Sequence, residues 1–162
     1  MRIWIAAVGA RPRESFDDLA QTYLDRIAPL LAGAGSKSGN PAKPAIDAPL
    51  FRSEQALWDT IAREQSRTAP LIVLLDERGK QLDSEAFAAR LGRERDEGRQ
   101  LVIFAIGPAD GWSPESRSRA GILLSLGPMT MAHELARVVI CEQVYRALTI
   151  LKGHPYHRSG SR

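Results

Sequence analysis

The chain has 162 residues, 44% of them hydrophobic, which is enough for one domain with a real core. The net charge of +3 is mildly basic and compatible with a nucleic-acid partner, whereas an aromatic content of only 6% argues against a base-stacking platform of the RRM or OB type. The sequence shows no apolar run of ~20 residues, no signal peptide and a single cysteine, so we expect a cytoplasmic protein without a membrane span or a disulfide framework.

The first part of the chain predicts one strand and two helices. Residues 2–8 are apolar and β-branched, as in a buried strand, and 15–31 place their large apolar side chains on one helical face. Residues 32–49 are rich in Gly, Ala, Pro and Ser and predict a mobile loop. A second helix is predicted over 53–65, with Ser53 as its N-cap.

Two continuous apolar runs in the middle of the chain predict strands that are covered on both faces. They are 71–75, which ends at Asp76 before a charged turn over 77–80, and 101–106. The helix between them is predicted to begin after the cap residue Asp83 and to end near Gly98.

The last third predicts a short helix opened by Ser113 and Pro114, a strand over 122–126 and a long helix from about 133 to 152. Because strands and helices alternate, the fold class is predicted as one α/β domain over 1–162, with a mainly parallel sheet and helices on both faces. Ligands of such sheets bind outside the carboxyl ends of the strands. The loops after Leu75, at 107–113 and at 127–132 are expected to meet there.

The last predicted helix is apolar on every side, so it must be buried on more than one face. One face fits the sheet. The other is covered either by a partner subunit, which would make a homodimer, or by another helix of the same chain; we favour the homodimer because it is the commonest assembly. Arg137 and Arg146 interrupt the apolar pattern, either as charges at the rim or as ligands for phosphate.

The segment after this helix gathers proton-active side chains. Gly153 is a natural helix stop, and the sequence His154-Pro155-Tyr156-His157-Arg158 follows it. Imidazoles titrate near neutral pH, so residues 154–162 are predicted to form a functional tail, the alternative being a frayed polar end.

Several common sites are absent from the sequence. It contains no P-loop, no G-x-G-x-x-G after a strand and no G-x-S-x-G elbow. His154 and His157 could form half of a metal site, but Pro155 breaks helical spacing and no Cys or carboxylate cluster accompanies them, so we predict no metal. Asp76 and Asp110, each near the end of a strand, could bind a ligand hydroxyl or cap a turn.

Four segments together resemble a known family. They are I-G-P-A-D-G at 106–111, L-S-L-G-P-M-T-M-A-H-E-L-A-R-V at 124–138, C-E-Q-V-Y-R-A at 141–147 and H-P-Y-H-R at 154–158. These resemble the SPOUT class of RNA methyltransferases, and within it the RlmH branch, which methylates N3 of a pseudouridine in 23S ribosomal RNA. The tail and the 124–138 segment are specific in combination, and either alone would be weak.

The resemblance implies a C-terminal trefoil knot whose loops hold S-adenosylmethionine, and a homodimer formed through the knot region. By position, the implied cofactor contacts are Leu75, Gly107, Leu126, Gly127, Pro128, Met129, Thr130 and Met131. The tail residues Tyr156, His157 and Arg158 would meet the RNA on the ribosome, with Arg137, Arg146 and His154 as further RNA contacts.

Residue chemistry assigns roles within this tail. The N3–H of pseudouridine is a weakly acidic imide, so a base with a pKa of about 6.5, such as His157, fits the reaction. Tyr156 could stack on the base or hydrogen-bond a carbonyl, and Arg158 could hold phosphate or stabilise the imide oxygens. His157 contacting only phosphate is the alternative.

Three departures from the family pattern remain. Pro108 replaces a second glycine and removes a backbone N–H, Ala132 replaces a proline, and 32–49 lack an expected strand. Two rival functions follow from other classes: a non-catalytic ribosome-associated RNA-binding factor of the same fold, which Pro108 favours, and a small-molecule α/β enzyme, in which the tail has no evident role.

Overall fold

The computed structural model describes residues 1–10, 14–32 and 43–156. His157 and Arg158, and therefore the predicted base, lie outside the described residues. The elements are β1 (Arg2–Val8), α1 (Glu14–Ala32), β2 (Ile46–Asp47), β3 (Leu50–Phe51), α2 (Glu54–Arg63), β4 (Leu71–Gln81), α3 (Ser84–Asp96), β5 (Leu101–Ile106), α4 (Pro114–Arg119), β6 (Ile122–Ser125) and α5 (His133–Leu151).

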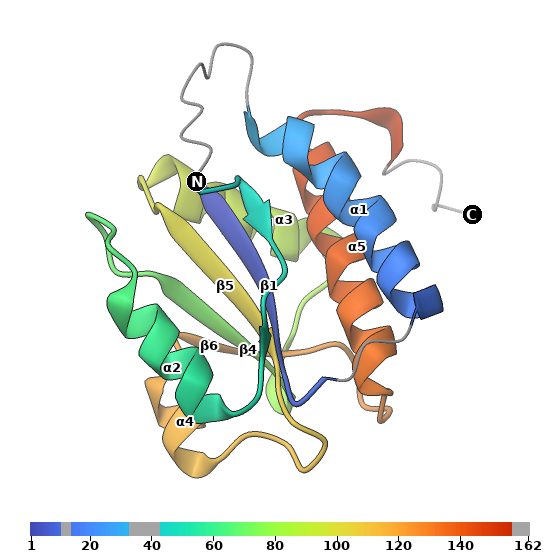
Figure 1. Cartoon of the computed structure of the whole chain (residues 1–162). Coiled ribbons are helices and arrows are strands. Elements are labelled where there is room, and N and C mark those ends of the chain that lie inside the picture. The colour runs from blue at the N-terminus through green and yellow to red at the C-terminus, as the bar shows by residue number, and fades with distance from the viewer. Residues whose placement is uncertain (11–13, 33–42, 157–162) are drawn as a thin grey trace.

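All described strand pairs are parallel and build one sheet in the order β2-β1-β5-β4-β6, with β3 also paired to β1. Helices α1, α3 and α5 cover one face of this sheet, and α2 and α4 cover the other (Figure 1). The predicted α/β fold class is confirmed. The trefoil knot that the resemblance implies stays a prediction.

Residues of the central strands divide between two cores because neighbouring side chains point to opposite faces. Ile3, Ile5 and Phe104 belong to the core beneath α1, α3 and α5. Trp4 and Ile103 belong to the core beneath α2. Burial on both faces explains why these strands read as continuous apolar runs rather than as alternating patterns.

The predicted helix caps are present in the structure. The side chains of Ser53, Asp83 and Ser113 each accept a hydrogen bond from the backbone N–H three residues later. Gly153 has a φ of +67°, the left-handed conformation expected after a helix end. The helix termini were therefore predictable to within two residues from local chemistry alone.

The predicted charged turn over 77–80 is wrong, because β4 continues to Gln81. Leu75 pairs with Leu124 of β6, and Lys80 then pairs with the same residue, so 76–79 form a bulge in the ladder. At Gly79 an added Cβ would lie 2.6 Å from backbone atoms of Leu123 and Leu124. Only glycine permits this close crossing of two backbones.

The predicted loop over 32–49 is wrong at its end. Ile46 and Asp47 form β2, which pairs with Ile3 and Trp4 of β1. Residues 33–42 lie outside the described part of the chain. The two-residue strand was missed because it has no apolar pattern of its own and is held by the neighbouring β1.

Helix α5 is covered within its own chain. It packs against α1 and α3 as well as the sheet, and Val138, Ile140 and Val144 are buried. The alternative named for this helix, an internal cover, is what the structure shows. The homodimer stays a prediction, but the apolar pattern of α5 does not by itself require one.

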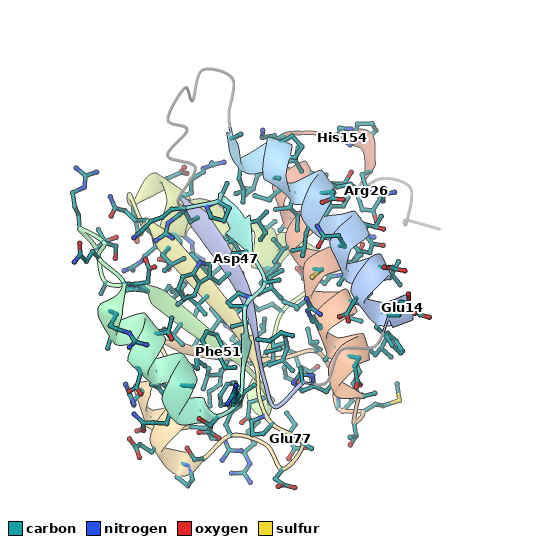
Figure 2. The ribbon with its side chains drawn as sticks, viewed as in Figure 1. Glu14, Arg26, Asp47, Phe51, Glu77 and His154 are labelled. Atoms are coloured by element: carbon teal, nitrogen blue, oxygen red, sulfur yellow. The ribbon has the colours of Figure 1, made fainter. Side chains whose placement is uncertain are left out.

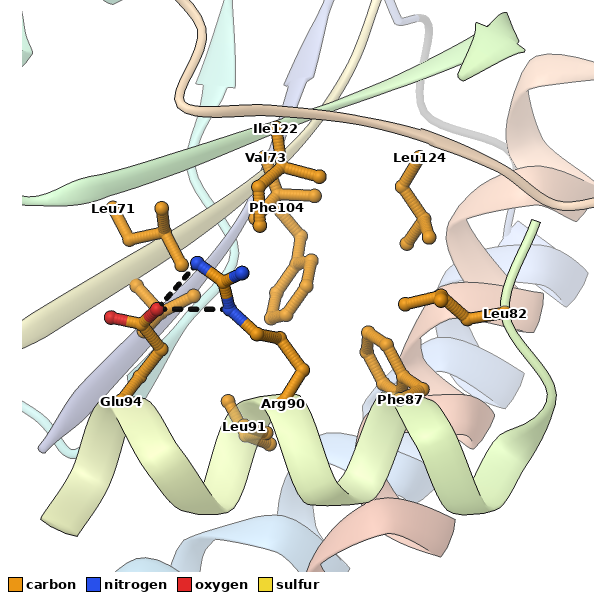
Figure 3. Close-up of a pocket in the computed structure, with 11 residues that line it drawn as sticks. Leu71, Val73, Leu82, Phe87, Arg90, Leu91, Glu94, Phe104, Ile122 and Leu124 are labelled. Carbon is orange, nitrogen blue, oxygen red and sulfur yellow. Dashed lines mark hydrogen bonds and ion pairs between the residues drawn. The ribbon is translucent and has the colours of Figure 1, made fainter. Parts of the chain in front are cut away.

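A small apolar cavity of about 20 Å³ lies between α3 and the β4–β6 edge of the sheet (Figure 3). Phe87 from α3 faces Val73 and Phe104 of the sheet there. Glu94, only 3% exposed, is held at one end by Arg90 at 2.7 Å and by Arg99 at 2.9 Å. These two ion pairs border the core beneath α3.

Candidate functional site

A cleft of about 520 Å³ opens at the carboxyl ends of the strands, where parallel sheets bind ligands. Its walls come from the middle of β4, the β5–α4 loop, the β6–α5 loop and the first turn of α5. The three segments that the sequence predicted to meet are therefore brought together, although the one after Leu75 is part of β4 and not a loop. Arg117 of α4 forms part of the rim.

Most of the residues implied as cofactor contacts line this cleft. They are Leu75, Gly107, Leu126, Gly127, Met129, Thr130 and Met131. Pro128 is exposed and is not part of the lining. The structure thus places the set around one space, and direct contact with a cofactor stays a prediction.

Trp112 forms the inner wall of the cleft and was not anticipated from the sequence. It is 3% exposed, and its indole N–H donates to the carbonyl of Leu75 at 2.9 Å. An added Cβ on Gly107 would lie 2.9 Å from the Trp112 ring. Gly107 therefore makes room for the indole, which in turn fixes the end of β4.

Asp76 and Arg117 form a buried ion pair beside Trp112. The Asp76 carboxylate accepts from Nε of Arg117 at 2.6 Å and from the backbone N–H of Arg78 at 2.8 Å. Burial opposes ionisation of Asp76, but these hydrogen bonds and the positive charge of Arg117 outweigh it and lower the pKa of the carboxyl. The Asp76 carboxylate thus joins β4 to α4, and because Asp76 also lines the cleft, its binding of a ligand hydroxyl stays a prediction.

Helix α4 is tied to α2 by a second, half-buried carboxylate. Glu54 accepts from the backbone N–H and hydroxyl of Ser113 and from the hydroxyl of Ser116. Ser116 also accepts from the indole N–H of Trp58 at 2.7 Å. Burial of Glu54 is outweighed by these donors, which lower its pKa. The network holds the rim of the cleft against the body of the domain.

The β6–α5 loop is braced near its start. The hydroxyl of Ser125 donates to the carbonyl of Gly127 at 3.0 Å and accepts from its N–H at 3.2 Å. Met129, further along, is 85% exposed. The loop thus presents a large apolar side chain at the mouth of the cleft.

His133 begins α5 between the cleft and a small cavity beside Arg137. Within the described residues, both of its ring nitrogens and Nε of Arg137 are buried without a hydrogen-bond partner. Arg137 itself is paired with Asp17 of α1 at 2.5 Å and is 14% exposed. Its guanidinium is engaged inside the chain, and contact with RNA stays a prediction.

The described part of the tail packs onto the far end of α5. The Tyr156 ring meets the Tyr145 ring edge-on at 4.7 Å, and its hydroxyl donates to Oε1 of Glu142 at 3.2 Å. Arg146 donates to the same oxygen at 2.6 Å. His154 is exposed and accepts from the backbone N–H of Tyr156 through Nδ1 at 3.2 Å.

The tail and the cleft lie at opposite ends of one long helix. His133, at the start of α5, lines the cleft, whereas Tyr156 follows the end of α5. A 19-residue helix is about 28 Å long at 1.5 Å per residue. In Figure 2 the cleft residue Glu77 and the tail residue His154 accordingly appear at opposite ends of the molecule.

These features define an α/β protein with a ligand cleft at the carboxyl edge of a parallel sheet. The family model described as "Predicted SPOUT methyltransferase" matches residues 1–157. The chain belongs to the SPOUT methyltransferase family, and within it to the group of its relatives named ribosomal RNA large subunit methyltransferase H. The predicted membership is confirmed, and the chain is a methyltransferase.

Two relatives in this group are similar over nearly their whole length. "Ribosomal RNA large subunit methyltransferase H" of Koribacter versatilis is 45% identical over 157 residues, which cover 97% of this chain and 98% of that protein. The protein of the same name from Rhizobium meliloti is 45% identical over 166 residues, covering 98% and 100%.

A solved structure supports the same fold. The SpoU methyltransferase AviRb from Streptomyces viridochromogenes matches with a TM-score of 0.50 and 16% identity, over 94% of this chain and 61% of that one. At this identity the likeness concerns the fold alone.

The described residues offer no sign of two other kinds of site. Among these, no group of three or more His, Cys, Asp and Glu side chains comes together as metal ligands would. No described helix combines the length and the apolar character needed to cross a membrane.

Proposed function

We propose that this chain uses S-adenosylmethionine to methylate N3 of a pseudouridine in 23S ribosomal RNA. The observation that carries the proposal is the convergence of the implied cofactor residues on one cleft. The relatives' names add that those proteins act on RNA of the large ribosomal subunit. A cytoplasmic location belongs to the same proposal.

The cleft fits S-adenosylmethionine in size and chemistry. Its volume falls in the range of small-molecule sites, and its lining mixes apolar side chains such as Leu126 and Met131 with the polar Thr130. Backbone groups of the 126–131 loop and of Gly107 would hold the polar ends of the cofactor. When bound, the cofactor supplies a methyl group activated by a positively charged sulfur.

The chain's part in the reaction is to position the uracil ring and remove its proton. We assign His157 as the base that accepts the N3 proton, since a neutral imidazole is available near pH 7. Arg158 stabilises the negative charge that the imide oxygens then develop. Tyr156 belongs to the same catalytic segment.

We propose further that the tail of one chain serves the cleft of another. Within one chain, the described part of the tail packs on the second half of α5, whereas the cleft lies at the start of this helix. A homodimer that sets the tail of one copy against the cleft of the other would bring the two together. The homodimer is therefore proposed because it would complete the site, and not because of the apolar pattern of α5.

Complementation between two inactive variants tests this arrangement. Gly107→Arg fills the cleft, and His157→Ala removes the base, so each homodimer should lose methylation of ribosomes. Unfolding and refolding the two together should restore activity, because a mixed dimer contains one intact cleft facing one intact tail. Lasting inactivity of the refolded mixture, with dimers shown to exchange, would contradict the shared site.

The non-catalytic RNA-binding factor is the second candidate, and Pro108 is the observation that favours it. Pro108 lines the cleft and lacks the N–H of the glycine usual in the family. Wild-type protein incubated with labelled S-adenosylmethionine and ribosomes separates the two. Transfer of label to 23S RNA supports the enzyme, whereas binding of ribosomes without cofactor binding or transfer supports the factor.

A further inference from the structure

The stem of the tail is held by a cluster of four side chains, three from the middle and second half of α5 and one from the segment after it, here called the stem cluster: Glu142, Tyr145, Arg146 and Tyr156. Glu142 is its centre. Oε1 of this carboxylate receives the hydroxyl of Tyr156 at 3.2 Å and both Nε and Nη2 of Arg146, at 3.0 and 2.6 Å. One oxygen thus joins the helix to the segment that follows it.

Ring contacts hold Tyr156 from two sides. Its ring stands edge-on to Tyr145 at 4.7 Å between centroids, and the Arg146 guanidinium lies 5.0 Å from its centroid. Tyr145 itself rests on Tyr23 of α1 at 6.1 Å. The last described residue of the chain is therefore fixed to both α5 and α1.

The protonation states of the stem-cluster side chains suit the hydrogen bonds that they make. The hydrogen bonds that Arg146 donates to Glu142 raise the pKa of Arg146, and burial together with the negative charge of Glu142 raises the pKa of Tyr156 to about 12. The hydroxyl of Tyr156 therefore stays protonated at neutral pH and serves as a donor. The Glu142 carboxylate is the acceptor that this donor needs.

We propose that Glu142 is a positioning residue for methyl transfer: it anchors Tyr156 on α5 and so sets where His157 and Arg158 begin. This inference rests on the proposed function, because the residues it positions are those assigned to catalysis. Glu142 acts through the backbone, because fixing Tyr156 fixes the point from which the following residues start. A base displaced by about 1 Å loses up to about 100-fold in rate.

Single-turnover methylation of ribosomes tests the proposal. Glu142→Ala should slow the chemical step by roughly 10- to 100-fold, because the tail loses its fixed origin, while cofactor affinity measured by calorimetry stays unchanged. Glu142→Gln keeps an oxygen acceptor for Tyr156 and should recover most of the rate. Glu115→Gln, in a matched carboxylate–arginine i,i+4 pair on α4, should resemble wild type.

A double variant separates positioning from general stability. If Glu142 acts through the tail, Glu142→Ala should cost nothing further once His157→Ala and Arg158→Ala together have removed both residues that it positions. Multiplying losses would overturn the proposal, and so would an unchanged rate in Glu142→Ala. Thermal unfolding of each variant identifies any loss of fold, and the isosteric Gln variant keeps the test valid in that case.

A readout independent of activity completes the design. Ring protons of Tyr145 and Tyr156 should give a nuclear Overhauser effect in the free wild-type protein, and Glu142→Ala should abolish it. Absence of this effect in active wild-type protein would overturn the anchor. An effect present in a protein that methylates nothing would instead overturn the proposed function and leave the anchor standing.

Discussion

Four carboxylates in this chain, buried or half-buried, accept hydrogen bonds from neighbouring donors, and their pKa shifts share one direction. Glu54, Glu64, Asp76 and Glu94 are each penalised by burial, yet hydrogen bonds and neighbouring positive charge lower the pKa of every one. A carboxyl whose folded pKa is depressed contributes stability above its unfolded pKa and loses it as pH falls through the folded value.

Acid should therefore destabilise the protein by protonating these carboxylates. The free energy of unfolding of the wild type should fall as pH drops below about 4. Glu94→Gln should reduce it by about 1–3 kcal/mol at pH 7, less than for a fully buried pair because Arg90 and Arg99 are partly exposed, and should flatten the acid slope. Urea unfolding at pH 7 and pH 3 measures both. If the curves of unfolding free energy against pH ran parallel for the wild type and Glu94→Gln, the role assigned to Glu94 would be refuted.

Gly107 is expected to be needed for Trp112 rather than for chain flexibility. Gly107→Ala places a methyl 2.9 Å from the indole, so Trp112 must move away from the Leu75 carbonyl. We expect a loss of about 1–3 kcal/mol in stability and weaker cofactor binding by calorimetry.

A smaller ring supplies the control for this prediction. Trp112→Phe leaves room for the added methyl, so the two substitutions together should cost less than the sum of their separate effects. Strict additivity would show that Gly107 and Trp112 are not coupled through this contact.

Among the elements, β4 depends most on a single residue. Gly79→Ala would bring a Cβ within 2.6 Å of three backbone atoms of β6, which no side-chain movement relieves. We expect a loss of about 3 kcal/mol or more, read as a lower midpoint in urea unfolding. Lys80→Ala, an exposed neighbour in the same segment, should change the midpoint little. Equal urea midpoints for Gly79→Ala and Lys80→Ala would mean that the backbones of β4 and β6 can move apart at little cost.

The elements divide clearly into those the sequence could predict and those it could not. Strands β1 and β5 and the helix caps follow from apolar runs and local hydrogen bonding, which need no partner to be recognised. The extension of β4 through Gly79 follows from pairing with β6, which lies far along the chain. Local charge at 77–80 favoured a turn, and tertiary pairing overrode it.

At the scale of the whole molecule, some features of the candidate site were likewise predictable from the sequence and others were not. The meeting of the three loops was predictable because the ends of parallel strands share one edge of the sheet. The roles of Trp112 and Arg117 were not, since each depends on a contact across the fold. The separation of the tail from the cleft follows from the predicted helix over 133–152, which lies between the 127–132 loop and the tail.

The proposed homodimer makes the last prediction. Light scattering should give about twice the 17.8 kDa mass of the chain if the tail of one copy serves the cleft of the other. Deleting 155–162 removes the described contacts of Tyr156 and should leave the dimer and cofactor binding intact while methylation is lost. A monomer that methylates ribosomes at full rate would refute both the dimer and the shared site.

The position of Trp112 has a spectroscopic consequence. All three tryptophans are buried in the core on the α2 side of the sheet, and Trp112 alone of them also lines the cleft. Its indole is fixed by a hydrogen bond to Leu75, so a molecule entering the cleft changes the surroundings of one ordered fluorophore. Intrinsic fluorescence should therefore follow occupancy of the cleft in unlabelled protein, and the signal should vanish in Trp112→Phe. The protein thus contains its own optical probe, placed where binding begins.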